Sequence, residues 1–272
     1  MSTGAAPETL DPDWRMPPLR EVQVLGRSIA YYEQGQGPAL VLAHGFSGSA
    51  YFEWGRVFDL LAERHRVVAP QLIGFLPSEQ ADMAYSTDAQ LAHLSGFLEA
   101  LDLGGCTLAG ESYGGWLVAA YAARAAAGST LARVDRYAIL AGAVGLVRTA
   151  QTPQPARPPP QTPLWRAIVR RLPELNPHDA ANNWARQRIF ADSDFARGWP
   201  DAVALAKIGA PTLLLWGDKD DLVPVRLGQA AAEAIPGSQL VVLPKIGHIP
   251  SIETPRDFVR VLTDFAAGRA VA

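Results

Sequence analysis

The chain has 272 residues, of which 49% are hydrophobic and 19% charged, a balance typical of a folded globular protein. Its formal net charge is −3 and it has no long basic run, which argues against nucleic acid as a partner. A single cysteine excludes an internal disulfide and a metal site built from cysteines. The length suits one large α/β domain or two small ones, and we expect no metal and no cofactor.

The polar N-terminal segment and the lengths of the apolar runs bear on where the protein is located. Residues 1–20 are polar and contain prolines, without the apolar core of a signal peptide. No apolar run approaches the ~20 residues that span a membrane. We therefore predict a cytoplasmic protein without a membrane partner, and the oligomeric state stays open.

Short β-type runs alternate with helical patterns along the chain. Glu21–Leu25 and Ser28–Glu33 predict a strand pair around a turn at Gly26. Further strands are predicted at Ala39–Ala43, Arg66–Pro70, Cys106–Ala109, Tyr137–Ala141, Thr212–Trp216 and Leu240–Leu243. Helices are predicted from Ser86 or Thr87, over Tyr113–Ala127, and after Thr254, a candidate N-cap followed by Pro255. This alternation indicates an α/β fold with a mostly parallel sheet of about eight strands, flanked by helices.

One segment interrupts the alternation. Between Gly145 and Pro200 there is no strand pattern, and Gln151–Pro163 has six prolines in thirteen residues, which predicts an extended connector. Two short helices are predicted after it, at about Leu164–Leu172 and His178–Phe190. So long an insertion between core strands suggests a separate cap. We predict a core formed by residues 1–146 and 201–272, with a helical cap over residues 147–200 after the sixth strand.

The predicted cap contains three of the seven tryptophans, Trp165, Trp184 and Trp199. One interpretation is that they pack the cap onto the core. The other is that at least one of them lines an apolar substrate pocket. The sequence does not choose between these interpretations.

The segment Thr107–Trp116 has the pattern of a strand that runs into Gly-x-Ser-x-Gly and then into a helix. This context predicts a nucleophile elbow with Ser112 at the tip of a sharp turn. Gly110 and Gly114 fit the pattern because side chains there would collide as the strand and the helix approach each other. Ser112 is therefore the candidate nucleophile, and Glu111 is expected to buttress the turn through a hydrogen bond.

A serine nucleophile needs a base, and the chain has five histidines. The contexts of His65 and His93 predict surface positions, and His178 is expected at the start of a cap helix. His248 follows the last predicted strand, at the sheet edge where α/β folds bind their ligands. His248 is therefore the candidate base.

The acid that orients this base is expected in the loop after the penultimate strand. The stretch Trp216–Pro224 contains three aspartates, Asp218, Asp220 and Asp221. A carboxylate on this loop can reach a histidine on the next loop, because both loops leave the same edge of the sheet. The residues alone do not choose among the three.

Together these motifs resemble the α/β-hydrolase family of serine hydrolases, over about Val22 to Ala267. The matching pieces are His44-Gly45-Phe46, Gly110-Glu111-Ser112-Tyr113-Gly114, Gly217-x-x-Asp220-x-x-x-Pro224, and Gly247-His248 with Pro250 and Glu253. They occur in the family order of serine, aspartate and histidine. The family pattern places the acid at Asp220, with Asp221 as the alternative.

The resemblance also implies an oxyanion hole formed by the backbone N–H groups of Phe46 and Tyr113, and a structural role for His44. One departure is Gln71, where the family commonly has aspartate. Since that loop lies near the active-site entrance in relatives, the substrates of relatives are a poor guide to those of this chain.

The resemblance implies a serine hydrolase that cleaves a carboxylic ester or lactone through an acyl-enzyme on Ser112, most like a carboxylesterase. The expected substrate is a small apolar ester. The alternative is a carbon–carbon bond hydrolase of the meta-cleavage-product type, which uses the same triad. Those enzymes usually have asparagine before the nucleophile and tryptophan soon after the catalytic histidine, where this chain has Glu111 and Ile249. A second alternative is a ligand receptor that retains the triad.

Overall fold

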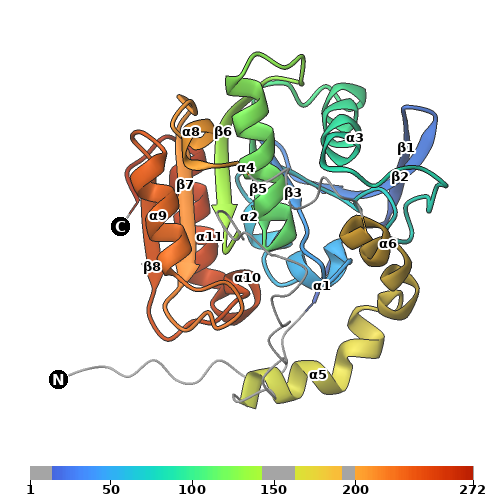
Figure 1. The fold of residues 1–272 in the computed structure, drawn as a ribbon. Coiled ribbons are helices and arrows are strands. Elements are labelled where there is room, and N and C mark those ends of the chain that lie inside the picture. The colour runs from blue at the N-terminus through green and yellow to red at the C-terminus, as the bar shows by residue number, and fades with distance from the viewer. Residues whose placement is uncertain (1–13, 143–162, 192–199, 272) are drawn as a thin grey trace.

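The computed structural model describes residues 14–142, 163–191 and 200–271. Within these residues, one sheet has the strand order β1-β2-β4-β3-β5-β6-β7-β8 (Figure 1). The strands are β1 Arg20–Val24, β2 Arg27–Gln34, β3 Ala39–Ala43, β4 Arg66–Pro70, β5 Cys106–Glu111, β6 Val134–Leu140, β7 Thr212–Gly217 and β8 Gln239–Leu243. The pairs β1–β2 and β2–β4 are antiparallel, and the remaining pairs are parallel. The predicted α/β fold with eight strands is confirmed.

Helices cover both faces of this sheet. They are α1 Ala50–Trp54, α2 Phe58–Ala62, α3 Thr87–Ala100, α4 Tyr113–Ala126, α5 Pro163–Leu175, α6 Asp179–Ala191, α8 Ala202–Leu205, α9 Arg226–Ala234, α10 Pro250–Glu253 and α11 Pro255–Ala266. Alternate residues of β3 divide the core between the two faces. Val41 and Ala43 pack in the cluster that contains α3 and α4, whereas Leu40 and Leu42 pack with α2 and α11. Because β3 is buried on both faces, it forms a continuous apolar run.

The turn and cap residues explain several element boundaries. The β1–β2 turn has positive φ at both Leu25 (50°) and Gly26 (75°), as a two-residue hairpin turn requires. Ser86, one of the two predicted candidates, caps α3 by accepting a hydrogen bond from the amide of Ala89. Thr254 is at the predicted N-cap position of α11, but its hydroxyl donates to the Asp257 carboxylate rather than accepting from the backbone.

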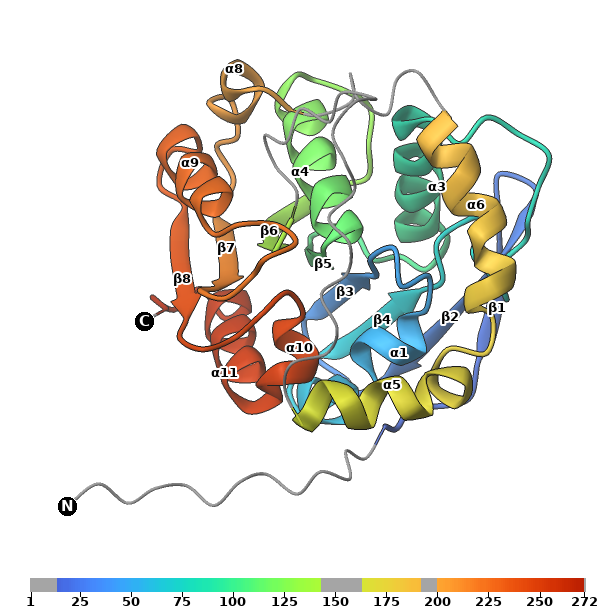
Figure 2. The same cartoon turned by 60° about the horizontal axis from the view of Figure 1, so that its bottom comes forward.

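The helices α5 and α6 lie in the region predicted as a cap, and their bounds agree with the two predicted helices. Helix α5 packs beside α1, in an apolar cluster that contains Ile168 of α5 and Phe52 of α1 (Figure 2). Helix α6 contacts the core through Trp184, whose ring lies against that of Tyr85 in the segment before α3. The predicted boundary at 146/147 and the proline-rich connector lie outside the described residues.

Two histidines predicted on the surface are buried, and that prediction is wrong. His65, between α2 and β4, is 4% exposed, and its Nδ1 lies 3.3 Å from the carbonyl of Leu61. His93 is 9% exposed on the inner side of α3, where its Nδ1 lies 2.8 Å from the carbonyl of Ala89. In each ring Nδ1 lies within hydrogen-bond distance of the carbonyl four residues earlier, so one ring nitrogen of each buried histidine has a partner.

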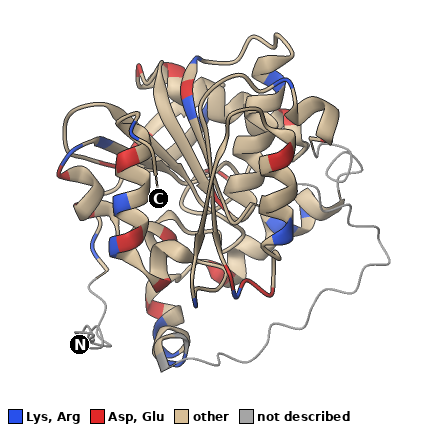
Figure 3. Ribbon diagram, turned by 90° about the vertical axis from the view of Figure 1, so that its left-hand side faces the viewer, with Lys and Arg blue, Asp and Glu red and all other residues tan. Residues whose placement is uncertain are grey.

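Charged residues are mixed over the surface. On the face drawn in Figure 3, basic and acidic residues are interspersed along the outer helices. Such mixing produces no single-sign field across that face that would steer a polyanion toward it. Among the residues that the structure describes, no helix combines the length and the apolar character needed to cross a membrane.

Candidate active site

Ser112 lies at a strained turn between β5 and α4. Its backbone has φ +56° and ψ −115°, a combination that costs a non-glycine residue about 1–3 kcal/mol. Neighbouring chain segments leave no room for side chains beside it. A Cβ on Gly110 would lie 2.3 Å from the carbonyl oxygen of Gly114, and one on Gly114 would lie 2.0 Å from that of Ala43. The predicted need for both glycines is confirmed, and the turn holds the Ser112 hydroxyl above the sheet.

The Ser112 hydroxyl is the end of a chain of hydrogen bonds. Its Oγ lies 2.9 Å from Nε2 of His248, and Nδ1 of His248 lies 2.8 Å from Oδ2 of Asp220. The three side chains come from the ends of β5, β7 and β8, which are brought together at the carboxyl edge of the sheet. This arrangement can pass a proton from the serine to the imidazole while a carboxylate fixes the ring.

The other aspartates of the β7 loop do not contact His248. The carboxylate of Asp218 accepts from the amide of Lys245, and Asp221 is exposed. Asp220 is buried, and its Oδ1 accepts from the amides of Leu222 (3.0 Å) and Val223 (2.7 Å). Because these amides fix Oδ1, Oδ2 faces the imidazole.

Two carboxyls, the buried Glu111 and the partly buried Glu253, hold the loop that carries His248. Glu253 accepts from the amides of Gly247 and Ile249, which flank the histidine. Glu111 accepts from the hydroxyl of Ser251 at 2.6 Å, as its predicted buttressing role requires. Burial raises the pKa of Glu111 well above its ordinary value, and the nearby Glu53 adds to the shift. Burial therefore favours the neutral form of Glu111, in which it supports the turn without placing a charge beneath it.

His44 orients the peptide that precedes Phe46. Leu72 donates its amide to Nε2 of His44 at 3.1 Å, so Nδ1 carries the proton and donates to the carbonyl of Gly45 at 2.8 Å. Burial lowers the pKa of His44 to about 4, so the ring is neutral at neutral pH. In a trans peptide the C=O and N–H point in opposite directions, so this bond turns the Phe46 N–H away from His44.

Two further side chains hold the same loop from the core. Glu53 accepts from the amide of Gly45 (2.6 Å) and from the hydroxyl of Ser47 (2.5 Å). Gln71 donates to the carbonyl of Gly48 (2.6 Å) and accepts from the amide of Ala50 (3.0 Å). A carboxylate at position 71 could not donate, so the departure from aspartate has a structural use here. The sequence reasoning missed Glu53, although an acidic residue inside the apolar run of α1 was an available signal.

The residues of this loop also lie close to Ser112. A Cβ on Gly45 would lie 2.9 Å from Cβ of Ser112, so only glycine fits there. The ring of Phe46 stacks on that of Tyr113, with centroids 4.1 Å apart, and lies 5.0 Å from that of Phe190 of α6. Tyr113 stacks in turn on Trp116. The two residues predicted to supply the oxyanion-hole amides therefore also present an aromatic surface beside the serine.

Of the three tryptophans predicted in the cap, Trp184 is the one whose side chain the structure describes. Trp184 is partly buried, with its ring against Tyr85 and the guanidinium of Arg188 at 3.7 Å from its centroid. These contacts pack α6 against the core. Trp199 and the side chain of Trp165 lie outside what the structure describes, so their pocket role stays a prediction.

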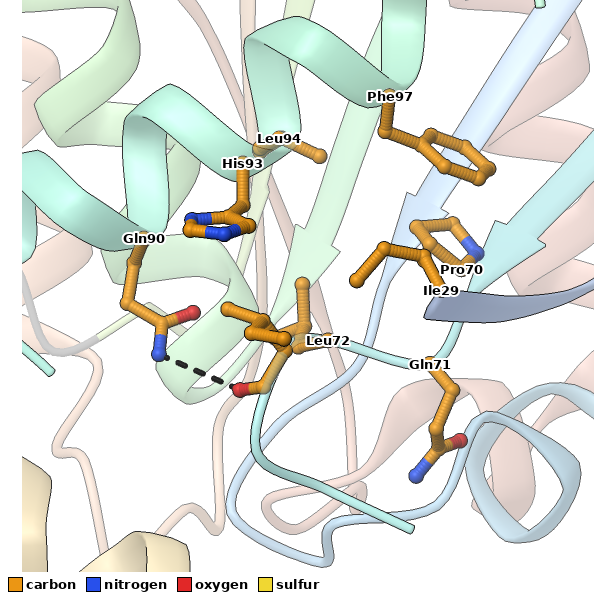
Figure 4. Close-up of a pocket in the computed structure, with 9 residues that line it drawn as sticks. Ile29, Pro70, Gln71, Leu72, Gln90, His93, Leu94 and Phe97 are labelled. Carbon is orange, nitrogen blue, oxygen red and sulfur yellow. Dashed lines mark hydrogen bonds between the residues drawn. The ribbon is translucent and has the colours of Figure 1, made fainter. Parts of the chain in front are cut away.

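A separate small cavity lies behind the loop after β4 (Figure 4). Its volume is about 10 Å³, which is room for about one water molecule and not for an organic substrate. Gln90 and His93 of α3 line it together with Gln71 and Leu72. Among the described residues, Oε1 of Gln90 and Nε2 of His93 have no hydrogen-bond partner. A single water donating to both atoms would satisfy them.

Glu53 makes the stability of the protein depend on pH. Burial raises its pKa from 4.5 to about 8, although the bonds from Ser47 and Gly45 oppose the shift. The folded state thus favours the neutral form of Glu53. The contribution of this group to the free energy of unfolding is complete below pH 4.5 and is lost as the pH rises to about 8. The free energy of unfolding should fall across this window with a slope of up to ~1.4 kcal/mol per pH unit from this group.

In the Glu53→Gln variant we expect a shallower slope, because glutamine makes the hydrogen bonds of the neutral acid and does not ionise. Urea unfolding at a series of pH values compares the two proteins. Glu233→Gln, a change on α9 far from the loop in sequence, is the control and should keep the wild-type slope. Equal slopes for Glu53→Gln and the wild type would contradict the assignment.

A model of the alpha/beta hydrolase family matches residues 40–261. The chain therefore belongs to the alpha/beta hydrolase family, whose fold it has and whose sequence motifs it brings together at one edge of the sheet.

Individual relatives of the chain hydrolyse different bonds. It is 32% identical over 260 residues to a 2-hydroxy-6-oxo-2,4-heptadienoate hydrolase from Pseudomonas putida strain F1, which covers 87% of this chain and 91% of the relative. It is 28% identical over 255 residues to Lipase 3 from Moraxella sp. strain TA144, covering 85% and 79%. Among solved structures it resembles a bacterial membrane phospholipase A, with a TM-score of 0.72 and 28% identity over 92% of this chain and 86% of the other.

Proposed function

We propose that this protein hydrolyses carboxylic esters of small apolar acids through an acyl-enzyme on Ser112. The hydrogen-bonded series Ser112–His248–Asp220 carries the proposal. It supplies a nucleophile, a base whose Nε2 lies 2.9 Å from the serine oxygen, and an acid 2.8 Å from the other ring nitrogen. The aromatic rings of Phe46 and Tyr113 support an apolar acyl group beside the nucleophile.

In the proposed reaction, Oγ of Ser112 attacks the ester carbonyl while Nε2 of His248 takes the hydroxyl proton. The amides of Phe46 and Tyr113 stabilise the oxyanion, and each such donor typically contributes ~3–4 kcal/mol in the transition state. His248 then gives its proton to the leaving alcohol. Water attacks the acyl-enzyme with the same base, which releases the acid and restores Ser112.

The surroundings of Ser112 favour an ester over an anionic dienoate. The guanidinium of Arg186, which lies beside the oxyanion loop, donates to the backbone carbonyls of Phe46 and Ser47 and pairs with Asp179. Because these bonds use the donors of the guanidinium, it is not free to bind a substrate carboxylate. The relation to Lipase 3 and to the phospholipase also supports ester hydrolysis.

A second candidate is carbon–carbon bond hydrolysis of a 2-hydroxy-6-oxo-dienoate. The 32% identity to the Pseudomonas putida hydrolase of that name favours it. Both candidates use Ser112 and His248, so substituting these residues does not separate them. The two candidates are separated by the substrates that the enzyme hydrolyses.

A panel of substrates tests the proposal. We expect many turnovers per enzyme with p-nitrophenyl esters, a change in kcat/KM with acyl length from acetate to octanoate, and weaker activity on a 2-hydroxy-6-oxo-dienoate. A kcat/KM for the dienoate at least 100-fold above that for the best ester or lactone would establish the second candidate. One burst of p-nitrophenol equal to the enzyme concentration, without further turnover, would indicate a receptor instead.

A further inference from the structure

We propose that polar side chains of the segment Asn176–Arg186 hold the oxyanion loop, residues 45–48, in the conformation that activates the ester. The proposal rests on the proposed function. Asn182 and Arg186, which both lie on α6, are the positioning residues. Arg186 acts through the carbonyl of Phe46 and Asn182 through that of Gly48, rather than on the substrate. The position of α6 on the core therefore affects how well the oxyanion hole stabilises the transition state.

Three successive carbonyls of the loop point toward this segment. Nε of Arg186 donates to the carbonyl of Phe46 at 2.7 Å, and its Nη2 donates to that of Ser47 at 2.9 Å. The Ser47 carbonyl accepts a second bond, from Nδ2 of Asn176 at 2.7 Å. Side chains more than a hundred residues away in sequence thus satisfy the loop backbone, which is costly to leave unpaired when buried.

The amide of Asn182 joins three segments. It is fully buried, with Nδ2 donating to the carbonyl of Gly48 at 2.7 Å and Oδ1 accepting from the amide of Leu76 at 2.7 Å. A Cβ on Gly48 would lie 3.1 Å from this Nδ2, so the loop and α6 are in close contact there. Neither end of the amide can turn without leaving a buried group unpaired.

The core and α6 both hold the carbonyl of Gly48, through Gln71 and Asn182, but around Phe46 they fix different peptides. From the core, His44 and Glu53 hold the carbonyl and the amide of Gly45. From α6, Arg186 holds the carbonyl of Phe46. The peptides on both sides of the Phe46 α-carbon are therefore fixed, one by each partner. The peptide that carries the Phe46 N–H is held by His44, so losing the α6 contact frees the following peptide, Phe46–Ser47, and with it the ψ of Phe46 and the path of the loop beside the oxyanion hole.

Arg186 is itself held in place on the helix. Its Nη2 pairs with Oδ1 of Asp179 at 2.5 Å, and its Nη1 donates to the carbonyl of Asp179. The side chain of Arg186 is 17% exposed and that of Asp179 is 47% exposed, so the guanidinium is held largely out of solvent while the carboxylate is in contact with it. The planar guanidinium of Arg186 donates to Asp179 in the first turn of α6 and to the carbonyls of the loop, so it links these two segments rigidly.

The variant that tests the proposal is Asn182→Asp. It keeps an acceptor for Leu76 but replaces the donor to Gly48 by an oxygen that faces another oxygen. Misplacing an active-site group by ~1 Å can cost about 100-fold in rate. We expect kcat for a p-nitrophenyl ester to fall about 10- to 100-fold, with KM changed less than about threefold.

The matched control is Asn183→Asp, the same substitution one residue along the same helix at an exposed position. We expect its kcat to stay within about twofold of the wild type. The second readout is the Kd of an alkyl boronic acid, which forms a tetrahedral anion on the serine and needs the oxyanion hole. It should weaken by about the same factor as kcat, whereas the Kd of the matching carboxamide, which forms no anion, should not change.

Wild-type kcat and boronate affinity in a folded Asn182→Asp protein would overturn the proposal. If that variant does not fold, as judged by circular dichroism, Arg186→Lys provides the same test, because lysine keeps the charge but cannot bridge the Phe46 and Ser47 carbonyls. Calorimetric boronate binding does not require turnover. A wild type that binds boronate but hydrolyses no ester would therefore reject the proposed function while the coupling is still measured.

Discussion

In the Ser112→Ala protein we expect kcat for ester hydrolysis to fall by roughly 10⁴–10⁶-fold, to the level that binding and the oxyanion hole alone provide. Alanine removes the only oxygen within hydrogen-bond distance of Nε2 of His248 among the described contacts of that atom. The fold should be unaffected, because the backbone at φ +56° is as strained for serine as for alanine. Steady-state kinetics with a p-nitrophenyl ester, together with a thermal melt, measures both effects.

Ser129→Ala serves as the control, because this serine is exposed after α4 and far from the site in sequence. We expect wild-type kcat for it. An irreversible organophosphonate should label wild-type and Ser129→Ala protein with one equivalent and leave Ser112→Ala unlabelled. Near-unchanged turnover in Ser112→Ala would reject Ser112 as the nucleophile, whichever substrate is used.

The parts of the site that could be predicted from the sequence are those fixed by local chain geometry. The Gly110-to-Gly114 turn requires small residues wherever it occurs, so its glycines identify it. The loops after β7 and β8 must meet because parallel neighbouring strands end at one edge, so topology could pair His248 with an aspartate of the β7 loop, and the family resemblance selected Asp220. The strands and the helices α5 and α6 could be predicted because their signals, too, are local patterns of apolar and turn-forming residues.

The side chains that hold the oxyanion loop could not be predicted from the sequence. Glu53, Asn182 and Arg186 belong to helices whose sequences carry no motif, and they meet the loop only after the chain has folded. The burial of His65 and His93 was mispredicted for the same reason. Whether such a histidine faces the core depends on which element covers it, and its polar ring is no guide when the carbonyl four residues earlier is a partner for Nδ1.

The second large effect is expected for Asp220→Asn, which should lower kcat by about 10⁴-fold. The reason is the fixed orientation of the side chain. The amides of Leu222 and Val223 both donate to Oδ1, so an asparagine must place its oxygen there. Its NH₂ group then occupies the position of Oδ2 and donates toward Nδ1 of His248. The imidazole can accept that bond only as the tautomer with its proton on Nε2.

That tautomer cannot act as a base toward Ser112, because the nitrogen 2.9 Å from the serine already carries a proton. The loss therefore arises with the three side chains in place, and KM should stay within a few-fold of the wild type. Asp221→Asn is the matched control, since Asp221 is exposed and was the alternative acid suggested by the motif. A large loss in Asp221→Asn and a small one in Asp220→Asn would reverse the assignment. Similar small losses in both would mean that the carboxylate is not needed to set the tautomer, and that the bonds at Oδ1 serve only to shape the β7 loop.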